Sequence, residues 1–226
     1  MSNKTWIGKI WPFADSATSV VPHTAFEEKK IRSMSKLLGH EHRYLFEQIA
    51  PPNTTEVREF EGKLRGTAFG SVGMIQPNGS GPLPNKHGTF EIVIFTKAKR
   101  PEGFELRFQA QDCTVQDKAY YGLYCKAREI ITQLARYAEE TVVNPYDAVD
   151  IMLEREGLMY HVIFDELHFK HRTFEIDGKH HQLMLCMLVH KQEIEYARQH
   201  SSRDMMNLLK EKNIYPYSDL GRDATV

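Results

Sequence analysis

Hydrophobic residues recur along this chain with two different spacings, which predict its helices and its strands. In the longest helical pattern, residues 120–139, five apolar or small positions are separated by alternating steps of four and three residues. They are Leu123, Ala127, Ile130, Leu134 and Tyr137. Such steps place side chains on one face of an α-helix. The pattern therefore predicts one long helix that buries a single stripe.

Three shorter helices are predicted nearer the two ends of the chain. The first spans residues 24–39, where Thr24 and Glu27 have the spacing of a capping box and Gly39 supplies a stop. The other two, at residues 191–199 and 203–212, follow one another near the C-terminus. We expect all three to pack an apolar face against the same domain.

Shorter runs of apolar and branched residues predict strands, which occur in two blocks. The first block comprises residues 43–49, 56–64, 66–76, 89–96 and 104–108, and the second comprises residues 149–153, 160–164, 167–169, 173–176 and 182–189. The run of four apolar residues at 92–95 predicts a strand covered on both faces. Asp177-Gly178 predicts a hairpin turn. Residues 77–88 hold three prolines and three glycines and predict a loop.

The order of these elements indicates the fold class. Strands come in blocks and do not alternate strictly with helices, which favours an α+β domain. We expect a mixed, mainly antiparallel sheet with helices packed against it. Residues 1–23 are predicted to form an N-terminal arm, and residues 24–226 a single domain.

The arm and the longest apolar run both argue against a membrane protein. Apolar residues in the arm are interrupted by Lys4, Gly8, Lys9 and Pro12, so no run reaches the length of a signal peptide. The longest apolar run, residues 183–189, is far below the roughly 20 residues that span a bilayer. We therefore expect a cytoplasmic protein that does not contact membranes.

The charge balance and the cysteine count exclude some classes of function without indicating one. The 226 residues include 29 Lys+Arg and 30 Asp+Glu, for a net charge of −1. This balance argues against a general binder of nucleic acid. The three cysteines, Cys113, Cys125 and Cys186, form no CxxC pair and are interpreted as free thiols in a reducing compartment.

Motifs for common enzymes and cofactor sites are absent from the sequence. It contains no GxGxxG before a helix, no GxxxxGK[ST] and no GxSxG. A metal-dependent enzyme is the alternative, because five histidines fall within residues 161–181. They are His161, His168, His171, His180 and His181. Imidazoles bind transition metals, but the spacing matches neither HExxH nor a zinc finger. Solvated or hydrogen-bonded histidines are the simpler interpretation, so no metal or cofactor is expected.

Several segments resemble the Suppressor of Fused domain family. In chain order they are Gly73-Met74, FEIVI at 90–94, QLARY at 133–137, NPYDAV at 144–149, FEIDG at 174–178, QEIEYA at 192–197 and SDLGR at 218–222. Their order and spacing extend the resemblance over about residues 26–226. Two places depart from the family: Tyr120-Tyr121-Gly122 stands where a Trp-Pro pair often precedes the long helix, and an Asn-Pro-Tyr turn replaces a glycine-rich one.

The resemblance implies a non-enzymatic protein-binding module. In animal members, this domain and a second one clamp an extended peptide of a zinc-finger transcription factor, a form of β-strand addition. Family binding residues fall by position on Tyr137 and Asp147. Local patterns offer plainer interpretations, because Tyr137 extends the buried stripe and Asp147 follows a turn that it could cap.

The resemblance also suggests a stand-alone bacterial member, because 226 residues leave no room for the second clamp domain. One role that it suggests is an immunity protein that neutralises a toxin by stoichiometric binding. The expected partner is a protein or peptide, with no role for nucleic acid. A further alternative is an interaction subunit of a larger assembly, in which the arm presents an apolar patch. That patch would comprise Trp6, Ile7, Ile10, Trp11 and Phe13.

Overall fold

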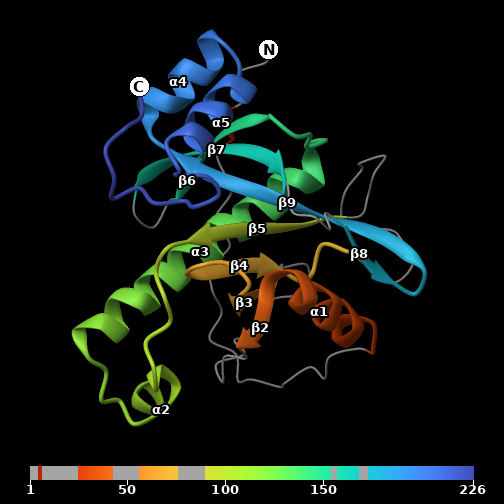
Figure 1. Cartoon of the computed structure of the whole chain (residues 1–226), viewed down its shortest axis with the longest axis vertical. Coiled ribbons are helices and arrows are strands. Elements are labelled where there is room, and N and C mark those ends of the chain that lie inside the picture. Colours follow the sequence, from red (N-terminus) through yellow and green to blue (C-terminus); the bar gives the residue numbers. More distant parts are fainter. Residues whose placement is uncertain (1–4, 7–24, 43–55, 76–89, 154–156, 168–172) are drawn as a thin grey trace.

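The structure is a computed structural model that describes residues 5–6, 25–42, 56–75, 90–153, 157–167 and 173–226. Its helices are α1 (Ala25–Leu38), α2 (Phe104–Gln109), α3 (Val115–Glu140), α4 (Lys191–Gln199) and α5 (Ser202–Glu211). Its strands are β1 (Thr5–Trp6), β2 (Gly39–His42), β3 (Val57–Gly62), β4 (Thr67–Ser71), β5 (Phe90–Thr96), β6 (Ala148–Leu153), β7 (Leu158–Glu166), β8 (Thr173–Ile176) and β9 (Lys179–Val189). Figure 1 shows their arrangement.

The strands of the described residues form one twisted, mixed sheet. Their order is β1-β6-β7-β9-β5-β4-β3-β2, and β8 pairs with β9 beside this path. The β1–β6 and β5–β9 pairs are parallel, and the other pairs are antiparallel. The predicted α+β class with a mainly antiparallel sheet is confirmed.

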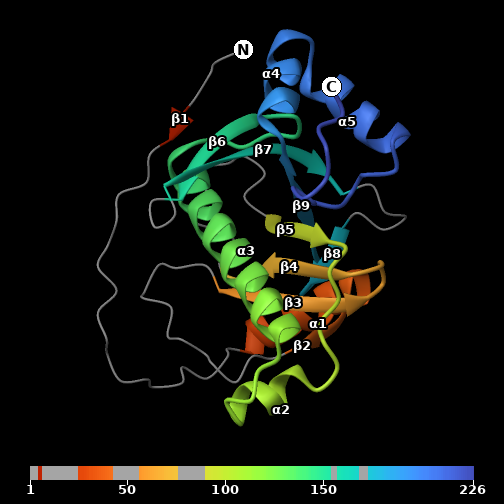
Figure 2. The same ribbon diagram turned by 90° about the vertical axis from the view of Figure 1, so that its left-hand side faces the viewer.

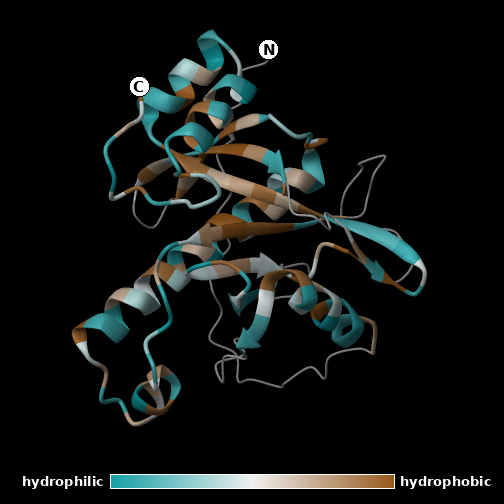
Figure 3. Cartoon of the chain, in the orientation of Figure 1, coloured by the Kyte–Doolittle hydropathy of each residue, from teal (hydrophilic) through white to brown (hydrophobic). Residues whose placement is uncertain are grey.

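Helices cover both faces of this sheet (Figures 1 and 2). α3 lies across one face and buries its stripe against β3, β4, β5 and β6. α1 packs on the opposite face near β3 and β8, while α4 and α5 pack near β6, β7 and β9. Every residue of β5 is buried, as expected for a strand covered on both faces. In Figure 3, hydrophobic residues are concentrated along β5 and in the middle of β9.

Most predicted elements are present, with two clear differences. The segment 104–108 forms helix α2, so the predicted strand is wrong. Its Phe104 and Phe108 rings are in contact, with 5.6 Å between their centroids, as residues one helical turn apart can be. The long helix begins at Val115 because Thr114 and Asp117 form a capping box.

Some predictions cannot be compared with the structure. The strand at 43–49, the loop at 77–88, residues 168–169 and nearly all of the arm lie outside the described residues. The Asp177-Gly178 hairpin turn is confirmed, since both residues have positive φ and Ile176 pairs with Lys179. No helix within the described ranges is both long and apolar enough to cross a bilayer.

A buried ion pair joins α1 to the centre of the sheet. Lys30 Nζ lies 2.9 Å from Glu91 Oε1 and 2.8 Å from the Ile75 carbonyl. Glu91 also accepts hydrogen bonds from the Ser71 hydroxyl and from the backbone of Met74 and Ile75. Because both charges are fully buried and hydrogen-bonded, the pair fixes α1 against β5.

Candidate functional site

The turn between α3 and β6 brings Tyr137 close to Asp147. Asp147 accepts a 2.8 Å hydrogen bond from the Asn144 backbone N–H, and its own N–H donates to the Asn144 carbonyl. These bonds close a tight turn at residues 144–147, in which Tyr146 has a φ of +70°. Asp147 therefore does cap the turn, as its position in the sequence allowed.

Backbone hydrogen bonds fix this turn against β7. The Tyr146 N–H donates to the Phe164 carbonyl at 2.7 Å, and the Phe164 N–H donates to the Asp147 carbonyl at 3.0 Å. On the α5 side, the Arg203 guanidinium lies 4.9 Å from the centre of the Tyr146 ring. The turn is therefore held at fixed points on both sides, which keeps the Asp147 carboxylate in one place.

Tyr137 lies beneath the turn, on the last part of α3. It is only 4% exposed and belongs to the main hydrophobic cluster, as its place in the stripe predicted. Burial raises the pKa of its phenol, and the neighbouring Asp147 carboxylate raises it further. The two residues that the family resemblance singled out thus form one local unit.

The outer edge of β6 begins directly after this turn. Within the described ranges, the strand paired beyond β6 is β1, which contributes only two residues. Thr5 pairs with Asp150 and Trp6 pairs with Ile151, in parallel. On the outer side of β6, Val149 and Met152 have no described strand paired with them, whereas on the inner side both pair with β7. Backbone groups at such an edge can pair with a segment of another chain.

The face of β6 toward α4 carries a partly buried charged group. Asp150 accepts hydrogen bonds of 2.7 Å from His161 Nδ1 and from Arg198 Nη2. Burial opposes ionisation of Asp150, but these two donors outweigh it and lower the pKa of the carboxyl. The carboxylate ties α4 to the strand edge and leaves the backbone of β6 in a fixed position.

The histidine-rich segment does not come together in the part of the chain that the structure describes. His161 pairs with Val189 in the sheet, whereas His181 pairs with Phe174, eight residues earlier along β9. At the usual rise of a strand, this separation is about 26 Å. His168 and His171 lie outside the described residues, and no group of three or more possible metal ligands occurs among those described.

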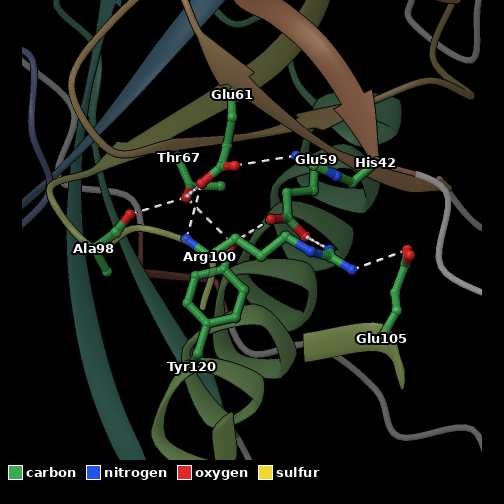
Figure 4. Close-up of polar contacts among 8 residues, drawn as sticks. All are labelled: His42, Glu59, Glu61, Thr67, Ala98, Arg100, Glu105 and Tyr120. Atoms are coloured by element: carbon green, nitrogen blue, oxygen red, sulfur yellow. Dashed lines mark hydrogen bonds and ion pairs between the residues drawn. The ribbon is translucent and has the colours of Figure 1, made fainter. Parts of the chain in front are cut away.

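A second polar cluster, which the sequence did not predict, lies where β3 meets α3 (Figure 4). Glu59 is fully buried and accepts a hydrogen bond from the Tyr120 hydroxyl. Arg100 bridges Glu59 at 2.8 Å and Glu105 at 2.9 Å. The Tyr120 hydroxyl oxygen also lies 3.1 Å from the hydroxyl oxygen of Thr67, on the neighbouring strand β4. Side chains from β3, β4 and α3 therefore converge on one buried carboxyl.

This cluster continues to the surface through a second carboxylate. Glu61, two residues along β3 on the same face, accepts hydrogen bonds from His42 Nε2 at 3.1 Å and from the Arg100 backbone N–H at 2.8 Å. Burial lowers the pKa of His42, and the nearby Arg100 lowers it further. The cluster links the edge strand β2 to the loop before α2.

Burial raises the pKa of Glu59 to about 7, against the opposing hydrogen bond of Tyr120 and the charge of Arg100. Paired carboxyls with raised pKa values are typical of acid–base catalysis. Glu59, however, has no exposed side-chain surface on which a substrate could bind. The cluster is better suited to fixing α3 on β3. In the sequence, only the Glu59–Glu61 spacing hinted at it, because Arg100 and Tyr120 are some 40 and 60 residues away.

Comparisons with known proteins found a matching family model and similar solved structures. The family model described as Suppressor of fused protein (SUFU) matches residues 67–223. The Sufu-Fu complex crystal structure has 12% sequence identity and a TM-score of 0.50, covering 88% of this chain and 92% of that chain. A crystal structure described as a SUFU homolog from Neisseria gonorrhoeae FA 1090 has 12% identity and a TM-score of 0.49, covering 89% of this chain and 97% of that chain. No curated protein sequence matches the chain.

Proposed function

Because this chain belongs to the Suppressor of fused protein family, we propose that it binds a segment of a partner protein along the outer edge of β6, beside Tyr137 and Asp147. The observation that carries the proposal is the edge itself. A fixed turn leads into β6, whose inner side pairs with β7. On its outer side the described neighbour is β1, which is two residues long and leaves the ends of β6 without a described partner there. A related fold, the Sufu-Fu complex, was solved with a partner.

The physical basis of such binding is strand addition. An extended segment of the partner pairs its backbone with the unpaired N–H and C=O groups of β6, which supplies affinity. Side chains on the two faces of the strand supply specificity. On one face lie Val149, Ile151 and Leu153 over α3, and on the other lies Asp150 with its charged neighbours.

In this mechanism, Asp147 marks one end of the docking edge. Its carboxylate is partly exposed and fixed by Asn144, so it can accept a hydrogen bond from the partner without reorganising. The buried Tyr137 side chain lies next to Asp147 and makes the surroundings of its carboxylate more apolar. Fixed groups of this kind lower the entropic cost of binding.

A pair of methionines provides a test of the edge. Met152 on β6 pairs with Met159 on β7, one strand farther in, and both are partly exposed. Tagged wild type, M152K and M159K would be compared in partner capture from the cells that produce this protein. A lysine on an edge strand opposes strand addition. We expect M152K to capture at most about one tenth of the stoichiometric partner that wild type captures. M159K should capture as much as wild type. Equal capture by all three proteins would contradict the use of this edge.

We further propose that the partner is a toxin and that the chain acts as its immunity protein, by occluding the toxin through one-to-one binding. Support comes from the family to which the chain belongs and from the small, fixed surface that the β6 edge offers to a single partner molecule. The test is to express the captured partner in a host, with and without this chain. Growth should fail with the partner alone, recover with the wild-type chain and fail again with M152K. A harmless partner would refute the toxin role and leave the binding role intact.

A further inference from the structure

A basic hollow lies at the opposite end of the sheet from β6. It has a volume of about 530 Å³ and is formed where α1 turns into β2 beside the end of β3. Eight of the described residues line it. They are Arg32, Ser35, Lys36, Gly39, His40, Glu61, Gly62 and Lys63. The hollow is therefore lined by residues of α1, of β2, and of the end of β3 with the turn that follows it.

Three cations from two elements surround this hollow. Arg32 and Lys36 lie one turn apart on α1, and Lys63 follows β3; all three are exposed. Among the described residues, no carboxylate forms an ion pair with any of them. Like charges four residues apart on a helix repel one another. Their grouping is thus a small cost to the fold that an anionic ligand would offset.

The one acid in the lining does not neutralise these cations. Glu61 directs its carboxylate toward His42, Thr67 and the backbone N–H of Arg100. Counting Arg32, Lys36 and Lys63 against Glu61 leaves a lining charge of +2, on a chain whose net charge is −1. The hollow is a local basic site on an otherwise balanced protein.

The strand beside the hollow offers backbone groups as well as charge. β2 is the last strand in the described sheet, with β3 paired on its inner side. In an antiparallel strand, alternate residues direct their N–H and C=O groups away from the neighbour. An extended polypeptide that reaches the hollow can therefore bind along β2, which a compact anion cannot.

We propose that this hollow and β2 form a second interaction surface, which binds an acidic extended segment of a partner protein. Carboxylates of the segment lie against Arg32, Lys36 and Lys63, and its backbone pairs with β2. A polypeptide suits the site better than a nucleic acid. Three cations are few for a phosphate backbone. Among the described residues that line the hollow, none is a Phe, Tyr or Trp on which bases could stack.

The test uses the full chain and defined peptides. Fluorescein-labelled octapeptides with alternating sequences, (Glu-Val)4 and (Lys-Val)4, and a twelve-residue oligothymidylate would be titrated and followed by fluorescence anisotropy. We expect the acidic peptide to bind at least about tenfold more tightly than the basic one. Binding should weaken about fivefold or more between 50 and 500 mM NaCl, because salt screens exposed charges. Tighter binding of the oligothymidylate than of the acidic peptide would overturn the proposal.

Charge-reversal variants locate the binding surface. R32E/K36E and K63E change α1 and the β3 end separately, so a defect in helix α1 cannot explain a loss in both. We expect each to weaken binding of the acidic peptide by about tenfold. K191E/K212E makes the same double change in exposed lysines of the α4–α5 region and should bind like wild type. Unchanged binding in R32E/K36E and K63E, or an equal loss in K191E/K212E, would refute this surface.

Discussion

Arg222 forms a two-pronged ion pair with Glu193, which anchors the C-terminal segment to the first turn of α4. Arg222 Nη1 lies 2.6 Å from Glu193 Oε1, and Nη2 lies 2.7 Å from Oε2. The same carboxylate accepts hydrogen bonds from the backbone N–H groups of His190 and Thr225. Both charged residues belong to segments that carry the family resemblance, so those segments are joined in space by a structural contact.

Removing one member of this pair should destabilise the fold. We expect R222A to lower the free energy of unfolding by about 3 kcal/mol, because it leaves a fully buried carboxylate without its counter-ion. R222K keeps the charge but loses the planar two-pronged contact, so its loss should be smaller. Urea denaturation of the three proteins measures the difference. Wild-type stability in R222A would show that the backbone donors alone suffice for Glu193.

Glu59 predicts an unusual pH dependence. Its pKa is about 7 in the folded chain, compared with 4.5 for an ordinary glutamate. Between these values, the folded state holds a proton that the unfolded chain has released. This carboxyl therefore makes the protein less stable as the pH rises from about 4.5 to about 7, by about 3 kcal/mol at most, and has a constant effect above that range.

The E59Q variant isolates this effect. Glutamine can still accept a hydrogen bond from Tyr120 but does not titrate, so the loss of stability between pH 4.5 and 7 should be smaller than in wild type. Urea denaturation across this range measures it. E105Q is the matched control, since Glu105 also pairs with Arg100 but is partly exposed. An E59Q profile parallel to that of wild type would show that Glu59 ionises normally.

Local patterns predicted the elements of this fold well, but not every element type. The stripe from Leu123 to Tyr137 gave the long helix, and Asp177-Gly178 gave the hairpin. Residues 104–108 alternate apolar and polar side chains, as a strand does, yet also place Phe104 and Phe108 one helical turn apart. Packing decided the outcome, because Phe104 and Tyr120 meet edge to face and Arg100 lies over the Phe104 ring. Such tertiary contacts override a short local pattern.

Contacts between distant residues could not be predicted from one sequence. Lys30 is buried against Glu91, 61 residues away, and no local pattern around Lys30 indicates this contact. The Glu59 cluster likewise depends on which strands become neighbours. For the candidate site, the family resemblance predicted Tyr137 and Asp147. The structure shows in addition that these two residues lie close together and that the β6 edge begins beside them. The role of Tyr137 and Asp147 in binding a partner remains a prediction.

Asp147 has a structural role and a proposed binding role, which D147N separates. Asparagine retains an oxygen that can accept the hydrogen bond from the Asn144 N–H, but it has no charge. We expect the free energy of unfolding to change by less than about 0.5 kcal/mol, while partner capture falls. D147A is the comparison, because it should lose both the turn cap and the binding. Full capture by D147N would show that the charge of Asp147 does not contact the partner.

The pairing of β1 with β6 should compete with a partner for the same edge. T5P/W6P removes both N–H donors of β1, because proline has no backbone N–H to donate to a neighbouring strand. Because the strand contains only two residues, global stability should change little, but amides of β6 should exchange with deuterium faster than in wild type. Mass spectrometry of the exchanged protein measures this, and T5V/W6F, which retains both donors, is the control. If β6 is the docking edge, T5P/W6P should also bind the captured partner more tightly. Faster exchange with weaker partner binding would instead indicate that β1 forms part of the docking surface.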